Sequence, residues 1–148
     1  MGWLDDATKR KEVEDKMRAA YAEWHKKQQQ RGIREKIETV LSKILTATGI
    51  KLKLDEFERN NILYTTLSHK QWESFYSITS GDYHLYILTV NNTKDGIVPG
   101  EDLMTYSFNY SPDDSRDARS RGPYKIRHEE VTEDNILKWI EDLMTWRK

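Results

Sequence analysis

The first thirty residues are polar and carry only a thin apolar edge. Residues 4–31 contain no Gly or Pro and are rich in Lys, Arg, Glu and Gln. Several Glu residues precede a Lys or Arg by four positions, and such pairs add about 0.2–0.5 kcal/mol each to a helix. The main apolar side chains recur at steps of four, three, one and three residues, which keep them on one side of a helix. They are Val13, Met17, Ala20, Tyr21 and Trp24. The pattern predicts a long, mostly exposed amphipathic helix.

A wider apolar stripe follows Gly32 and predicts a second helix over residues 33–48. Its members are Ile33, Ile37, Val40, Leu41, Ile44 and Leu45. At 100° per residue, the mean direction of this stripe is roughly 140° from the first one. Either the chain bends at Gly32 or two helices serve two surfaces. Gly49 suits the left-handed position after a helix, and Ile50 is placed to reach back to Leu45, as in a Schellman cap.

Beyond Gly49 the apolar period shortens to two residues, which is typical of strands. Six β-like runs follow, at 50–54, 62–67, 72–79, 83–91, 103–110 and 124–131. Arg59–Asn61 is turn-like, and Gly81 supplies the positive φ of a tight hairpin. The run at 83–91 is apolar on both faces, so we expect it in the middle of the sheet. Residues 111–123 are expected to form a connecting loop.

The last segment carries clear helix signals. Thr132 is a good N-cap, Val131 and Ile136 are placed for a hydrophobic staple, and the apolar stripe runs to Met144. The order is then helix, helix, about six strands and helix. Hairpin-length connections predict an α+β fold with a mainly antiparallel sheet. Two helices pack on this sheet, and a long charged helix precedes them. We expect an N-terminal helical appendage over 1–31 and an α+β domain over 33–148.

Composition narrows the function classes. The formal net charge is −1, so no global field attracts nucleic acid or an acidic membrane. There are no cysteines, which excludes disulfides, thiolate zinc sites and cysteine nucleophiles. The N-terminus shows no apolar signal region, and no run reaches the ~18 apolar residues of a membrane span. We expect a soluble protein without membrane contact, cytoplasmic in its own cell or in the host cell if it is viral.

The search for catalytic chemistry yields no motif. The four histidines show no metal-ligand spacing, although His84 and His128 lie in expected strands that are able to meet across the sheet. Adjacent carboxylates on a strand point to opposite faces. Phosphate-binding loops and nucleophile elbows are absent. We expect no catalytic residue, metal site or cofactor. The sequence leaves open whether the chain is an enzyme, although the lack of motifs favours a non-enzymatic protein. The alternative is a small enzyme whose site is not visible in the sequence because its residues meet only in the folded chain.

The apolar edge of the first helix is the leading candidate for binding. Its partner-binding residues are expected to be Val13, Met17, Tyr21 and Trp24. Trp and Tyr are common anchors of protein interfaces. This edge is expected to dock on a protein partner, on a second copy or on its own sheet. The first hypothesis is therefore a small non-enzymatic interaction or accessory protein, in the style of a phage or mobile-element component.

The alternative hypothesis rests on a basic strip between residues 116 and 127. Arginines with an aromatic side chain suit phosphate or single-stranded nucleic acid. The strip consists of Arg116, Arg119, Arg121, Tyr124, Lys125 and Arg127. Three aspartates lie close by, so the same segment also reads as a solvated loop closed by its own Asp–Arg pairs. Nucleic acid is thus a possible partner in this second interpretation.

Overall fold

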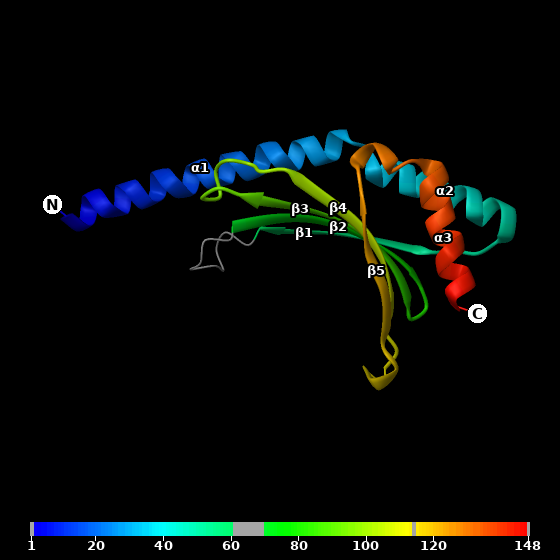
Figure 1. The fold of residues 1–148 in the computed structure, drawn as a ribbon. Helices are drawn as coiled ribbons and strands as arrows, with labels where there is room; N and C mark the ends of the chain where they lie inside the picture. Colours follow the sequence, from blue (N-terminus) through cyan, green and yellow to red (C-terminus); the bar gives the residue numbers. More distant parts are fainter. Residues whose placement is uncertain (1, 61–69, 114, 148) are drawn as a thin grey trace.

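The computed structural model describes residues 2–60, 70–113 and 115–147. The helices are α1 (Gly2–Gln30), α2 (Ile33–Thr48) and α3 (Glu133–Arg147), with short 3₁₀ turns η2 (Ser115–Asp117) and η3 (His128–Glu130). The strands are β1 (Lys53–Asn60), β2 (Lys70–Ser80), β3 (Tyr83–Thr93), β4 (Asp102–Tyr110) and β5 (Arg119–Ile126). Neighbouring strands pair antiparallel in the order β1-β2-β3-β4-β5 (Figure 1). The α+β fold is confirmed, with five described strands instead of about six.

Some strand boundaries differ from the expected ones. The run at 62–67 lies outside the described residues. Asn60, expected in a turn, still belongs to β1 because its pairing with β2 continues to Trp72. The expected loop 111–123 is shorter, since pairing with β4 starts β5 at Arg119. The expected strand 124–131 ends at Ile126, and η3 begins at His128.

One face of the sheet meets α2 and α3, and their contact forms the main core (Figure 1). Alternate residues of the strands point to this face, as the period of two predicts. Full burial of a large apolar side chain contributes about 1.5–3 kcal/mol. Side chains at the centre of the core include Ile37, Ile78, Leu85, Ile87, Ile136 and Leu143.

The predicted end of α2 at Gly49 and the predicted N-cap of α3 at Thr132 are confirmed, but the Ile50 N–H donates to the Thr48 hydroxyl and not to a helix carbonyl as a Schellman cap requires. Gly49 has φ 76°, and its N–H donates to the carbonyl of Leu45 over 2.8 Å. Thr132 caps α3, with its hydroxyl accepting from the Asn135 N–H over 3.1 Å. Gly32 has φ 67° and separates α1 from α2. The two helices serve different clusters, because α2 belongs to the main core and α1 packs in a separate one.

Candidate interaction surfaces

The C-terminal half of α1 is anchored to its own sheet by aromatic packing. Trp24 is only 4% exposed, and its ring centroid lies 5.6 Å from that of Trp72 on β2. Tyr21 packs edge-on against Trp72 at 6.0 Å. Met17 and Ala20 complete this cluster. Of the four predicted partner-binding residues, Tyr21 and Trp24 therefore contact the protein's own sheet, Met17 packs against the same cluster, and Val13 lies beyond it.

A partly buried carboxylate reinforces the anchor. Asp102 at the start of β4 accepts hydrogen bonds from the Trp24 indole at 2.8 Å and from Gln28 at 3.3 Å. Arg31 forms a 2.7 Å ion pair with the same carboxylate, and the Asn91 amide donates to it over 2.7 Å. Three of these four partners come from α1 or the turn after it. Asp102 thus ties the end of α1 to the end of the sheet where β3 connects to β4.

The charge state of this carboxylate follows from its surroundings. Burial by itself raises the pKa of Asp102, but the hydrogen bonds from Asn91 and Trp24, the charge of Arg31 and the hydrogen bond from Gln28 outweigh it. The net pKa is lowered. Asp102 is therefore a stable anion, and its role is to hold neighbouring elements together.

Asn91 extends the anchor into the β3–β4 connection. Its side-chain oxygen accepts from the Gly100 N–H over 2.8 Å, and its amide donates to the Gly100 carbonyl over 3.0 Å. A Cβ on Gly100 would collide with the backbone carbonyl of Asn92. The connection is therefore held tightly against β3, next to the Asp102 carboxylate.

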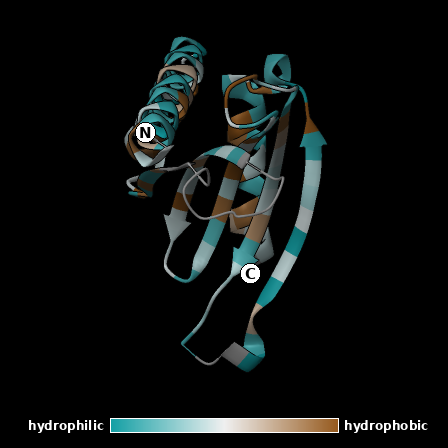
Figure 2. Ribbon diagram, turned by 90° about the vertical axis from the view of Figure 1, so that its left-hand side faces the viewer, coloured by the Kyte–Doolittle hydropathy of each residue, from teal (hydrophilic) through white to brown (hydrophobic). Residues whose placement is uncertain are grey.

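The N-terminal half of α1 has a different character. Every residue from 2 to 16 is exposed, including Trp3 at 75%, Leu4 at 57% and Val13 at 42%. Figure 1 shows this half running away from the body of the protein, with the N-terminus at its free end. Figure 2 shows a mostly hydrophilic helix, interrupted by isolated hydrophobic positions. Large apolar side chains are thus presented on an exposed, mostly polar helix.

The predicted basic strip does not form one surface. Arg121 pairs with Phe108 and Tyr124 pairs with Tyr106, so β5 has one extra residue between them. This bulge places Tyr124, like Arg119 and Arg121, on the helix-covered face of the sheet. Lys125 pairs with Thr105, whose position points to the opposite face.

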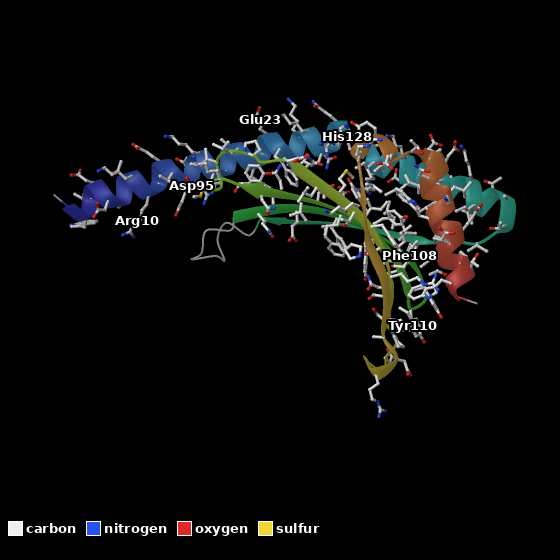
Figure 3. The ribbon with its side chains drawn as sticks, in the orientation of Figure 1. Arg10, Glu23, Asp95, Phe108, Tyr110 and His128 are labelled. Atoms are coloured by element: carbon white, nitrogen blue, oxygen red, sulfur yellow. The ribbon has the colours of Figure 1, made fainter. Side chains whose placement is uncertain are left out.

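The outer members of the strip also separate. Arg127 bonds to Glu130 at 3.3 Å beyond the end of β5, and Arg116 lies in η2 at the other end. Figure 3 shows how far apart these ends are, with Tyr110 near one and His128 near the other. The structure brings together only Arg119, Arg121 and Tyr124 from the predicted nucleic-acid-binding set.

A hollow of about 690 Å³ lies where β4 and β5 separate, beside η3. His128 and several carboxylates line this hollow. A catalytic site assembled from residues far apart in the sequence would need such a group of side chains. However, His128 and its 3.2 Å partner Glu129 are more than half exposed. His84 does not join it, because it bonds to Thr79 at 3.0 Å and pairs with Asn109 within the sheet. Among the described residues, no three His, Asp or Glu side chains are grouped to hold a metal ion.

The second face of the sheet carries an aromatic row that the sequence did not single out. The ring centroids of Phe57 and Phe75 lie 5.5 Å apart, and those of Phe75 and Tyr86 lie 4.9 Å apart. Tyr86 stacks on His84 at 5.7 Å. These residues come from β1, β2 and β3, and Phe57 is half-exposed. The period-two pattern of each strand was visible, but the cross-strand register that aligns the rings was not.

Comparison with known proteins adds no assignment. None of the helices that the structure describes is long and apolar enough to cross a membrane. No family model, curated protein or solved structure matches this chain.

Proposed function

We propose that the chain is a small non-enzymatic accessory protein that docks a protein partner through the projecting half of α1. The partner contacts Trp3, and Leu4 and Val13 flank this tryptophan on its two sides around the helix axis. The Trp24 end of the helix holds the arm on the sheet. This assignment moves the contact towards the N-terminus, because Met17, Tyr21 and Trp24 already pack against the protein itself.

The observation that supports the proposal is the contrast between the two halves of one continuous helix. An isolated helix shorter than about 12–15 residues is marginal in water. The anchored half supplies the nucleus that the exposed half lacks. Tryptophan is among the residues that most often dominate interface energies, and Trp3 is largely exposed at the outer end of the arm.

Site-specific photo-crosslinking in cells that produce the protein provides the test. A photoreactive phenylalanine analogue replaces Trp3 or Val13 in two separate variants, and Ala47 on α2 in a control. Ala47 is exposed but lies on a different helix. We expect one discrete crosslinked band from the α1 positions and none from Ala47. Equal bands from all three positions would contradict a specific docking arm.

The mass of the band distinguishes a different protein from a second copy. A band at twice the mass of the chain would show that α1 binds a second copy of the protein, and it would contradict a different protein as the partner. A different protein is then purified and titrated against the wild type and a Trp3→Ala, Leu4→Ala variant. We expect an affinity loss of about tenfold or more, which corresponds to about 1.4 kcal/mol. Unchanged affinity would refute the role of these residues.

A further inference from the structure

Two arginines of β5 converge on one tryptophan of α3. Arg119 and Arg121 are two residues apart on the strand, so they point to the same face with their Cα atoms roughly 6–7 Å apart. The Arg121 guanidinium carbon lies 5.1 Å from the centroid of the Trp146 ring, and that of Arg119 lies 5.5 Å from it. Arg119 also lies 4.8 Å from the Tyr110 ring. The aromatic rings hold both cations at one place.

Because β5 has one extra residue between Arg121 and Tyr124, Tyr124 lies on the same face of the sheet as the two arginines. Tyr124 packs on Tyr106 at 5.0 Å and on Phe108 at 6.4 Å, on the same face as the arginines. Trp146 contacts Phe108 and Tyr83 from the α3 side. The two guanidinium groups therefore sit on a built aromatic platform formed by β3, β4, β5 and α3.

The charges of this pair are not neutralised within the described part of the chain. There, neither Arg119 nor Arg121 has a carboxylate ion pair or a hydrogen-bond acceptor, and both are exposed. Each guanidinium carries five N–H donors in a planar fork. The contrast is Arg127, whose guanidinium is paired with Glu130. Two adjacent forks with unused donors match the oxygens of one doubly charged anion.

We propose that Arg119 and Arg121 form a binding site for a phosphate monoester, with Trp146 and Tyr110 as its aromatic platform. The dianion matches the two positive charges, and an aromatic or heterocyclic ester group is able to contact these half-buried rings beside the guanidinium groups. A phosphodiester carries one negative charge per phosphate, so it matches the pair less well. The site is separate from the α1 arm and does not rest on the proposed function.

The test is a titration of the full-length ¹⁵N-labelled protein at constant ionic strength, with inorganic phosphate and phenyl phosphate as probes. The indole N–H signal of Trp146, assigned with a Trp146→Phe variant, reports binding at the platform. The Arg119→Gln, Arg121→Gln variant removes both charges. The Arg119→Lys, Arg121→Lys variant keeps the charges but loses the planar forks. The matched control is Arg10→Gln, Arg18→Gln, because both arginines are exposed on α1.

We expect saturable shifts of the Trp146 signal in the wild type and the control, with phenyl phosphate binding more tightly than inorganic phosphate. The glutamine variant loses the response, and the lysine variant weakens it by about tenfold. A wild-type Trp146 signal that does not move, or a response that persists in a folded glutamine variant, would overturn the site. Tighter binding of oligothymidylate, lost in the same variant, would overturn the monoester in favour of a nucleic-acid backbone.

Discussion

The indole N–H of Trp24 donates a 2.8 Å hydrogen bond to the carboxylate of Asp102, which lies 78 residues further along the chain. This bond joins the N-terminal helix to the fourth strand. Around it, the ring of Trp24 packs on Trp72 and the other carboxylate oxygen pairs with Arg31. The region expected to be an appendage is therefore connected to the sheet by both apolar and polar contacts.

Replacement of Asp102 by Asn is expected to destabilise the fold by about 2–4 kcal/mol. The change removes the charge that faces Arg31 and one of the acceptors in the partly buried hydrogen-bond group. Urea unfolding measures the free energy. The exposed neighbour supplies a control, since Glu101→Gln should change stability by no more than about 0.5 kcal/mol. Equal losses in the two variants would show that the buried contacts are not responsible.

The same carboxylate predicts a pH dependence. Because its folded-state pKa is lowered from the ordinary value of 3.8, its stabilising contribution is complete above that value. The contribution is lost as the pH falls through the folded-state pKa. Unfolding of the wild type and Asp102→Asn is compared from neutral to acid pH. Their stability difference should be constant down to about pH 5 and shrink below about pH 4. A constant difference throughout would contradict the assignment.

Truncation of the two tryptophans of α1 should change the stability of the protein by very different amounts. Trp24→Ala removes a buried ring and should cost about 3–5 kcal/mol. Trp3→Ala removes an exposed ring and should stay within about 0.5 kcal/mol of the wild type. Thermal or urea unfolding of both variants gives the comparison. A large loss from Trp3→Ala would mean that the projecting half is packed in solution.

Hydrogen exchange should divide α1 into two parts. Amides within residues 2–16 open locally, because no buried packing holds them, and they should exchange faster than those within residues 20–30. Exchange followed by mass spectrometry or NMR resolves the boundary. Uniform protection along the helix would argue against a free arm.

The β3–β4 connection should tolerate no side chain at Gly100. A Cβ there collides with the Asn92 carbonyl, so Gly100→Ala should cost about 1–3 kcal/mol. Gly2→Ala is the matched control, since a Cβ at Gly2 meets no atom within 4 Å. The measurement is the melting temperature of both variants. Similar values would show that the connection relaxes freely.

The helices were predictable because their signals are local. Gly49 and Thr132 end and begin helices through contacts within four residues. The boundaries of the strands depend on pairing, which is non-local. Apart from Phe57, β1 has a polar sequence after Leu54, and only its register with β2 shows that the strand continues to Asn60.

The candidate sites were harder to predict for the same reason. The apolar stripe that contains Trp24 can be read from the sequence. Its partner Asp102 cannot, because this carboxylate lies on β4, far away along the chain. The sequence shows that residues 116–127 are rich in basic side chains. Which of these side chains share a face of the sheet depends on the bulge in β5. Gly122 and Pro123 within one strand were the available signal, since Gly and Pro inside strands often mark bulges.

The bulge has a consequence for solubility. β5 is an edge strand with almost entirely exposed residues, and such an edge is a template for aggregation by strand addition. Pro123 has no N–H to offer another chain, and Arg119, Arg121 and Lys125 make like-charged edges repel. These features disfavour the addition of another strand at this edge of the sheet.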